Sequence, residues 1–367
     1  ACAMFRSTGR LLAAGRAVTV VGSGNWGSVA ARIVGQNVRR HPDFDEHVRM
    51  WVHEEEVAPG MLLSSVINKR HENVKYLPGV DLGSNVVAVP DLREAVEGSS
   101  LIVFVTPHQF IKALCPVVKS AASSDAEAIS LIKGMEVTPA GGFELISALI
   151  EQETGLRCSV LMGANIADEV ARERFSEATV GHAEGEEVAG ERWRRLFHTK
   201  YFHVSAVPDV VGCELCGTLK NIVALAAGFV DGLELGNNTK AAVIRIGLVE
   251  MKRLARRFFP SVRDETYFES AGIADLITTC FGGRNRRCAE AFARRARSGR
   301  PASWADLEAE LLGGQKLQGV LTSQEVQAVL RGSNLEDEFP LLTTIDRICR
   351  GELPPDAIVD YASLGRS

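Results

Sequence analysis

The stretch VTVVGSGNWGS, residues 18–28, determines the fold of the first part of the chain. Residues typical of a strand lead into a Gly-x-Gly-x-x-Gly pattern, and small residues typical of a helix follow. In such a unit the first glycine permits a tight turn, the second lets the backbone approach a pyrophosphate, and the third lets the helix pack on the strand. The pattern therefore predicts a dinucleotide site rather than a glycine-rich turn without a ligand. The predicted contacts are Gly22, Ser23, Gly24, Asn25, Trp26 and Gly27.

The end of the next predicted strand, 48–52, bears on which dinucleotide binds. The strand runs into His53, Glu54, Glu55 and Glu56, and no arginine stands at its end. An acidic residue at this point binds the ribose 2′-hydroxyl and repels the 2′-phosphate of NADP. We therefore expect NAD as the cofactor. The pattern leaves open which glutamate acts, and the alternative is that all three are solvated acids at a helix start.

The first half of the chain alternates short apolar strands with helical segments. The predicted strands are 17–21, 48–52, 86–89, 101–105, 128–132 and 159–162. The predicted helices between them include 26–38, 109–121 and 143–153. Because short runs rich in Val and Ile are typical of parallel strands buried on both faces, this half should form a Rossmann-type, doubly wound α/β sheet.

The pattern changes near Pro208, after which no further strand is predicted. The helical segments of the second half are 209–231, 239–259, 289–296, 304–312 and 323–330. Pro208 suits the first turn of a helix, where its missing N–H group costs nothing. We expect the active site in a cleft between the two domains. The predicted divisions are a disordered extension at 1–16, a nucleotide-binding domain at 17–205, an all-α catalytic domain at 206–360 and a tail at 361–367.

The composition is that of an ordinary globular protein. Of 367 residues, 46% are hydrophobic and 24% are charged, which argues against disorder. The net charge of −5 provides no basic field for a general nucleic-acid binder. We find no apolar stretch of the roughly 20 residues needed to span a bilayer, so no membrane or nucleic-acid partner is expected.

The cysteines and the N-terminal residues bear on metal binding and localisation. A disulfide framework belongs to short secreted chains, so the eight cysteines indicate free thiols. Cys213 and Cys216 have C-x-x-C spacing inside a predicted helix, and we interpret them as core residues rather than metal ligands. Residues 1–16 contain three arginines and no acid, which fits either a ragged tail or a targeting remnant. We expect a cytoplasmic protein, with organellar targeting as the alternative.

Several polar residues interrupt apolar or small-residue segments and are candidates for chemistry. They are Lys133, Asn165, Lys220, Asn221, Asp275, Arg284 and Asn285. Hydride reduction of a ketone needs a proton donor, a group that polarises the carbonyl and a cationic clamp for any phosphate. Each residue alone has a structural explanation, such as a strand end or a helix surface. Lys220 is the strongest candidate, because a charge within the helical segment GTLKNIVA at 217–224 requires a reason.

Several longer segments of the chain are far more specific than the glycine pattern. They are VGSGNWGS at 21–28, HENVKYLPG at 71–79, PHQF at 107–110, SLIKG at 130–134, VLMGANIA at 160–167, LKN at 219–221, NNTKAAVIR at 237–245, ADLITTCFGGRNR at 274–286 and GQKLQG at 314–319. Together these segments resemble the NAD-dependent glycerol-3-phosphate dehydrogenases, specifically their eukaryotic cytosolic branch. The family often has Phe in place of His53, beside the adenosine, and Asp in place of Asn237.

The resemblance implies a fold, a reaction and a set of site residues. The fold would be a Rossmann domain followed by a helical domain like that of 6-phosphogluconate dehydrogenase. The reaction would be the NAD-dependent interconversion of dihydroxyacetone phosphate and sn-glycerol 3-phosphate. The implied catalytic residues are Lys220 as acid–base, Lys133 beside nicotinamide and substrate, and Asn165, Asp275 and Thr279 in support. Substrate contacts would come from Lys133, Asn221, Arg284 and Asn285. Further cofactor contacts would come from His53, Phe110, Lys133, Ala167, Arg284, Lys316 and Gln318.

The resemblance also implies a homodimer built through the helical domain. It suggests a place in carbohydrate and glycerophospholipid metabolism, linking glycolysis, NADH reoxidation and the supply of glycerolipid precursors. Two alternatives are a related hydroxy-acid dehydrogenase and an NAD-binding regulatory module that has lost catalysis. Arg284, suited to a phosphate, argues against the first, and the intact Lys220 and Asp275 argue against the second.

Overall fold

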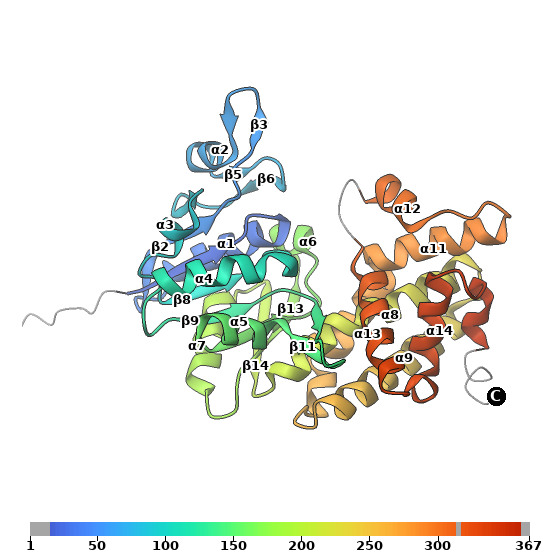
Figure 1. The fold of residues 1–367 in the computed structure, drawn as a ribbon. Helices are drawn as coiled ribbons and strands as arrows, with labels where there is room; N and C mark the ends of the chain where they lie inside the picture. Colours follow the sequence, from blue (N-terminus) through green and yellow to red (C-terminus); the bar gives the residue numbers. More distant parts are fainter. Residues whose placement is uncertain (1–14, 313–316, 361–367) are drawn as a thin grey trace, which may run out of the picture.

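The computed structural model describes residues 15–312 and 317–360, and its sheet-containing half lies beside a helical half (Figure 1). The main sheet has the strand order β14-β13-β12-β9-β8-β1-β2-β7, and neighbours are parallel except β12 and β13. The order reverses at β1, so the carboxyl end of this strand is the switch point at which ligands bind in such sheets. The strands are β1 (Arg16–Val21), β2 (Phe44–Trp51), β7 (Val86–Val89), β8 (Leu101–Phe104), β9 (Glu127–Ser130), β12 (Cys158–Met162), β13 (Ser176–Gly181) and β14 (Phe202–Val207).

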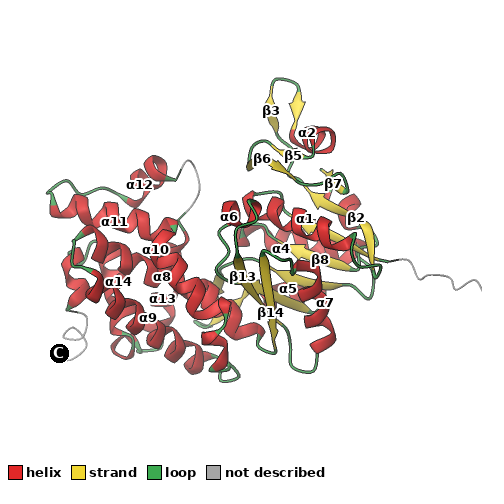
Figure 2. Cartoon of the chain, turned by 180° about the vertical axis from the view of Figure 1, so that it is seen from behind, coloured by secondary structure: helices red, strands yellow, loops and turns green. Residues whose placement is uncertain are grey.

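Helices cover both faces of this sheet, which confirms the predicted doubly wound architecture (Figure 2). One face packs against α1 (Asn25–Val38), α6 (Ala167–Ala171) and α7 (Glu187–Phe197). The other packs against α3 (Leu92–Val96), α4 (Ile111–Ala121) and α5 (Ile146–Thr154). A 3₁₀ turn, His108–Phe110, precedes α4.

The six strands predicted from the sequence are present, but the edge strand β14 and its neighbour β13 were not predicted. Polar residues interrupt the apolar run expected of a buried strand in both segments. In the folded protein these polar side chains make tertiary hydrogen bonds. The Thr179 and Ser205 hydroxyls, for example, both contact the carboxylate of Glu269, at 3.4 and 2.8 Å.

The prediction of a helix over 143–153 was wrong at its start. β11 (Phe143–Leu145) pairs with β10 (Met135–Val137) in an antiparallel hairpin, and α5 begins only at Ile146. Met135 and Leu145 are buried in the core of the helical half. This tertiary packing favours the hairpin over a longer helix, and the local sequence pattern gives no sign of it.

A small excursion between β2 and β7 projects from the sheet (Figure 1). It was not predicted, because its strands are too short to show a period. It contains β3 (Glu56–Ala58), β4 (Met61–Leu62), α2 (Leu63–Arg70), β5 (Glu72–Asn73) and β6 (Leu77–Asp81).

The second half is helical, as predicted. Its short turns are the 3₁₀ segments Glu265–Phe268, Glu336–Glu338 and Pro355–Val359 and the π-helical turn Ser270–Ala274. Its helices are α8 (Val210–Gly232), α9 (Asn237–Phe258), α10 (Asp275–Gly282), α11 (Arg284–Arg297), α12 (Trp304–Leu311), α13 (Gln318–Gly332) and α14 (Pro340–Cys349).

The start of α8 corrects the role given to Pro208. The helix begins at Val210, and its N-cap Asp209 accepts a hydrogen bond from the N–H of Gly212 at 2.8 Å. Pro208 therefore precedes the cap instead of forming the first turn. The last strand of the sheet runs to Val207. The division at 205/206 stays a prediction, and most of the extension and the whole tail, at 1–14 and 361–367, lie outside the described residues.

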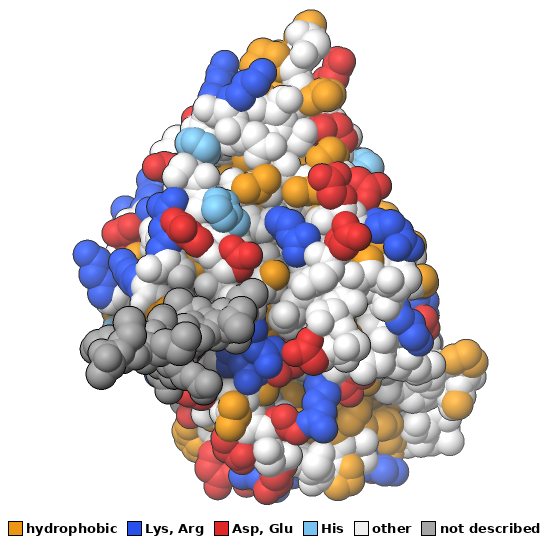
Figure 3. Space-filling view, turned by 90° about the vertical axis from the view of Figure 1, so that its left-hand side faces the viewer, with side chains coloured by type: hydrophobic (Ala, Val, Ile, Leu, Met, Phe, Trp, Pro, Cys, Tyr) orange, Lys and Arg blue, Asp and Glu red, His pale blue; other side chains and the backbone are white. Residues whose placement is uncertain are grey.

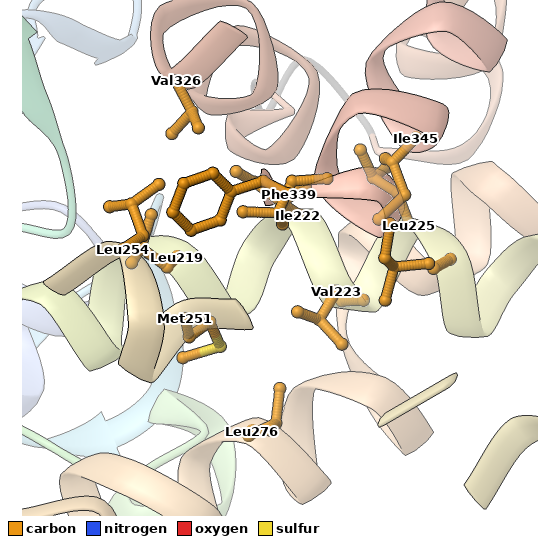
Figure 4. Close-up of a cluster of buried hydrophobic side chains, with 14 of the residues drawn as sticks. Leu219, Ile222, Val223, Leu225, Met251, Leu254, Leu276, Val326, Phe339 and Ile345 are labelled. Carbon is orange, nitrogen blue, oxygen red and sulfur yellow. The ribbon is translucent and has the colours of Figure 1, made fainter. Parts of the chain in front are cut away.

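Helix α8 is the central element of the helical half. Figure 4 shows side chains of α8, among them Leu219, Ile222 and Val223, packed among residues of the surrounding helices. Helix α8 is long and apolar enough to cross a membrane, which was not expected from the sequence. However, 89% of its most apolar 18-residue segment is buried inside the protein. Cys213 and Cys216 are buried free thiols on this helix.

Charged side chains of both signs cover the sheet-containing half. On the face shown in Figure 3 the acidic and basic groups are intermixed. Ion pairs among the described residues of this half include Arg195 with Asp43 at 2.7 Å and Arg32 with Glu173 at 2.9 Å. This distribution agrees with the small net charge of −5.

Candidate active site

The glycine loop lies at the switch point and has the geometry of a dinucleotide site. Gly22 has φ +124°, and a Cβ atom there would lie 3.0 Å from the carbonyl oxygen of Val105, just beyond β8. A Cβ atom on Gly27 would lie 2.2 Å from the carbonyl oxygen of Gly22. Only glycine fits either position, because the turn and the helix–strand contact are both too close for a side chain.

Gly24 is different, because a Cβ atom there would meet nothing within 4 Å. Gly24 is the N-cap of α1, and no side chain caps this helix start. An uncapped helix start with open space beside its glycine is the arrangement in which the first N–H groups of a helix can accept a pyrophosphate. The residues fit NAD.

Neighbouring segments hold the loop in place. The amide of Asn73 donates to the carbonyl of Ser23 at 2.8 Å and to the hydroxyl of Ser28 at 2.9 Å. The amide of Asn25 donates to the carbonyl of Tyr76 at 2.8 Å, and the Trp26 ring packs edge-on against a core phenylalanine. The side chains of Asn25 and Trp26 thus contact protein. The support by Asn73 was missed, because no local pattern indicates a contact 50 residues away.

The acidic strand end has partners of its own. The Glu54 carboxylate accepts hydrogen bonds from the N–H of Ser64 at 3.1 Å and from its hydroxyl, so it caps the start of α2. Glu55 pairs with Lys75, while His53 and Glu56 are exposed. The contact of one of these acids with a ribose stays a prediction, as does adenine stacking by His53.

Four of the predicted catalytic residues meet where the two halves join. Asp275 begins α10, and one of its carboxylate oxygens accepts a hydrogen bond from Lys220 on α8. The other accepts one from Lys133, which follows β9, at 3.2 Å. Lys220 also donates to the hydroxyl of Thr279 at 2.7 Å, and that hydroxyl donates to the Asp275 carbonyl at 2.7 Å. Thr279 thus acts with Asp275 in orienting the Lys220 ammonium group.

The electrostatics of this cluster favour proton exchange at Lys220. The Lys220 side chain is 5% exposed, whereas that of Lys133 is 24% exposed. The pKa of Lys220 is lowered to about 7, chiefly by burial; the charge of Asp275 opposes this lowering and the charge of Lys133 adds to it. A lysine with a pKa near neutrality can both donate and accept a proton under ordinary conditions.

Asn165 lies at the same edge of the sheet, because β9 and β12 are parallel and Asn165 follows β12 as Lys133 follows β9. Its side chain is buried, and its amide nitrogen has no hydrogen-bond partner among the described residues. A buried unpaired N–H donor costs free energy unless a ligand satisfies it. Asn165 is therefore suited to contact a substrate oxygen.

The residues predicted to hold a phosphate form a second group. Arg284 is the first residue of α11, whose start has no side-chain cap, and it is exposed. The amide of Asn285 donates to the side-chain oxygen of Asn221 at 2.9 Å and accepts from the N–H of Gly319 at 2.9 Å. These bonds join α8, α11 and the start of α13, so the buried Asn221 and Asn285 stabilise the segment that presents Arg284.

The remaining predicted cofactor residues are spread over several elements. The Phe110 side chain is 50% exposed at the start of α4, Ala167 opens α6, and Gln318 opens α13. Their contacts with the cofactor stay predictions. Lys316 lies outside the described residues.

Comparison with known families now decides the assignment. The models for the N-terminus and the C-terminus of NAD-dependent glycerol-3-phosphate dehydrogenase match residues 17–188 and 209–360, respectively. The chain belongs to the NAD-dependent glycerol-3-phosphate dehydrogenases. This dehydrogenase is accordingly an NAD-dependent oxidoreductase, and the match does not favour a hydroxy-acid dehydrogenase or an inactive module.

Individual relatives of the dehydrogenase carry the same family name. It is 59% identical to glycerol-3-phosphate dehydrogenase (NAD+) of Cuphea lanceolata, over 94% of this chain and 91% of the relative. Identity is 58% to the chloroplastic enzyme 1 of Arabidopsis thaliana, over 94% of this chain and 85% of the relative. It is 51% to the cytoplasmic enzyme of Drosophila virilis, over 94% and 95%.

Solved structures show the same fold as this dehydrogenase. The glycerol-3-phosphate dehydrogenase of Saccharomyces cerevisiae superposes with a TM-score of 0.87 at 45% identity, over 95% of this chain and 99% of that one. The GPDH of Dunaliella salina has a TM-score of 0.92 at 46% identity. This chain is covered to 99% in that match but spans only 63% of the Dunaliella chain.

Proposed function

We propose that this dehydrogenase interconverts dihydroxyacetone phosphate and sn-glycerol 3-phosphate, with Lys220 as the general acid–base. The observation that supports the proposal is the buried Lys220 that shares the carboxylate of Asp275 with Lys133. An isolated lysine at this depth would be costly to charge, so the paired carboxylate and the nearby lysine together poise it for proton transfer.

The proposed residue roles follow from this arrangement. NADH, when bound at the glycine loop, supplies the hydride. Lys220 donates a proton to the substrate oxygen during reduction and removes it during oxidation. Asp275 and Thr279 orient Lys220, while Lys133 and Asn165 polarise the carbonyl. Arg284 and the start of α11 hold the phosphate, since a guanidinium pairs with two phosphate oxygens and a helix N-terminus favours an anion.

The pH dependence of the two directions should have opposite signs. Because the pKa of Lys220 is lowered to about 7, the lysine loses its proton as the pH rises through neutrality. Reduction needs the charged form, so its kcat should fall above about pH 7, whereas kcat for oxidation should rise over the same interval. The measurement is kcat in each direction at saturating cofactor and substrate. A common sign in both directions would contradict Lys220 as acid–base.

Replacing Arg284 with lysine should raise KM for dihydroxyacetone phosphate about tenfold, because the point charge of lysine cannot form the two parallel bonds of a guanidinium. Turnover of unphosphorylated dihydroxyacetone, which has no phosphate for Arg284 to hold, should be much less affected. Arg287→Lys is the matched control, since Arg287 is exposed one turn further along α11. Equal losses with both substrates would show that Arg284 acts on something other than the phosphate.

The direct test of the function is turnover by the purified protein. NADH oxidation should follow addition of dihydroxyacetone phosphate, with little response to small 2-keto acids. NADPH should be a poorer reductant than NADH. A protein that binds NADH but reduces neither class of substrate would instead be a regulatory module.

Assembly, localisation and pathway extend this proposal. We expect a homodimer through the helical domain, which sedimentation can test. We expect a cytoplasmic enzyme that links NADH reoxidation to glycerolipid supply, as the cytoplasmic Drosophila relative supports. The chloroplastic Arabidopsis relative supports the alternative. Localisation of residues 1–16 fused to a fluorescent protein would distinguish the two.

A further inference from the structure

The π-helical turn Ser270–Ala274 connects the two parts of the active site. The hydroxyl of Ser270 accepts a hydrogen bond from the N–H of Ala164 at 3.3 Å, and Ala164 directly precedes Asn165. The carbonyl oxygen of Ser270 accepts a hydrogen bond from the N–H of Asp275. A single residue thus links the loop that carries Asn165 with the residue that orients Lys220.

The contact between Ser270 and the Asn165 loop is tightly packed. A Cβ atom on Gly163 would lie 2.8 Å from the Ser270 hydroxyl oxygen and 2.5 Å from the Cα atom of Ala178. Ser270 itself is only 7% exposed. The loop therefore has little room to move relative to Ser270 while the chain packs in this way.

The turn is also anchored to β13 and β14 of the sheet, although it belongs to the helical half. The N–H of Ala271 donates to the Thr179 hydroxyl at 3.3 Å. Glu269, directly before the turn, accepts a hydrogen bond from Ser205 on β14 at 2.8 Å. These bonds fix the turn to the half that binds the nucleotide.

The backbone of the turn departs from an ordinary α-helix. Gly272 has ψ −105°, outside the helical range, and a Cβ atom there would lie 2.4 Å from the carbonyl oxygen of Tyr267. Single π-helical turns are uncommon and occur frequently at functional sites. Here the turn directs the N–H of Asp275 to the carbonyl of Ser270.

We propose that Ser270 is a positioning residue of the reaction, which fixes the Asn165 amide relative to the Asp275–Lys220 pair. The proposal rests on the proposed function, in which both groups act on one substrate oxygen. Proton donation and carbonyl polarisation must converge on that oxygen, and a displacement of about 1 Å can cost 10²-fold in rate. Ser270 does not touch the reacting atoms and acts through the two segments that it joins.

The test compares Ser270→Thr with Ser270→Val, because Thr and Val have nearly the same volume and differ in the hydroxyl group. Any effect of overpacking is therefore shared. We expect kcat of the Val variant to fall about tenfold or more below that of the Thr variant. KM for dihydroxyacetone phosphate should change little. The Kd for NADH, measured by fluorescence titration, should stay within about twofold of wild type in both variants.

A second readout separates positioning from a general loss of stability. Loss of the hydroxyl bond to Ala164 should let the turn shift, and Asp275 should shift with it because its N–H stays bonded to the Ser270 carbonyl. The charged Lys220 is then less well stabilised, so the pH at which kcat for reduction declines should shift downward in the Val variant. Ser270→Ala, the smallest change, should show the same shift if the Val variant fails to fold.

Ser147→Ala is the matched control. The Ser147 hydroxyl is buried and donates to Glu214 on α8 at 2.5 Å, so it also joins the two halves, but it is no part of the site. This variant should lose thermal stability while keeping kcat and its pH profile.

Two outcomes are distinguishable. Equal kcat values and equal pH profiles in the Thr and Val variants, with normal wild-type turnover, would overturn the positioning role. Absence of turnover of dihydroxyacetone phosphate by the wild-type protein would instead overturn the proposed function.

Discussion

Replacing Lys220 with alanine is expected to lower kcat about 10²–10⁴-fold, the contribution typical of general acid–base catalysis. The Kd for NADH should change little, because the glycine loop that receives the pyrophosphate lies in the other half of the protein. Asp275 keeps its hydrogen bond with Lys133 at 3.2 Å, so its charge stays partly compensated in the variant. Steady-state kinetics in both directions and a fluorescence titration with NADH measure these effects.

Lys240→Ala is the matched control for this prediction. Lys240 is another buried lysine of the helical half, and it pairs with Asp231 at 2.8 Å. After its removal Asp231 still pairs with Arg286 at 2.7 Å. This variant should lose stability but keep kcat within a few-fold of wild type. A Lys220→Ala enzyme that retained more than about a tenth of its kcat would exclude Lys220 as the proton donor.

Replacing Gly24 with valine is expected to weaken NADH binding by about 100-fold or more while leaving the fold intact. Gly24 has φ −63° and ψ −173°, an extended conformation that valine adopts readily, and its Cβ position meets nothing within 4 Å. The new side chain would therefore occupy the space into which the pyrophosphate must come. Calorimetric titration with NADH and a melting curve give the two quantities.

Gly27→Ala provides the contrast. Its Cβ atom would lie 2.2 Å from the carbonyl oxygen of Gly22, so this variant should lower the melting temperature as well as NADH binding. If Gly24→Val bound NADH as tightly as wild type, the cofactor site would have to lie elsewhere.

The features that the sequence predicted well depend on residues that are adjacent in the chain. The glycine loop is one strand–turn–helix unit, so its spacing alone indicated the site at the end of β1. Lys220 stood out because a charge interrupts an apolar helix. Local patterns could not predict that Asp275 bridges Lys220 and Lys133, because Asp275 and Lys133 are 142 residues apart in the chain.

Residues with more than one plausible use were harder to assign from the sequence. Glu54 was among the candidates for a ribose contact, yet its carboxylate caps α2 through Ser64. Polar residues also interrupt the apolar pattern of β13 and β14. In the structure two of them, Thr179 and Ser205, bond to Glu269. No local sequence pattern indicates a role for Ser270. Its hydrogen bonds to the Asn165 loop and to Asp275 become visible only in the folded structure.

Chemical rescue distinguishes Lys220 from Lys133 as the proton donor. Small amines of graded pKa are added to Lys220→Ala and to Lys133→Ala during reduction of dihydroxyacetone phosphate. Amines are expected to restore turnover by Lys220→Ala, with a rate that follows the pKa of the amine as general acid catalysis requires. Rescue of Lys133→Ala with that dependence, while Lys220→Ala stays inactive, would instead assign the proton to Lys133.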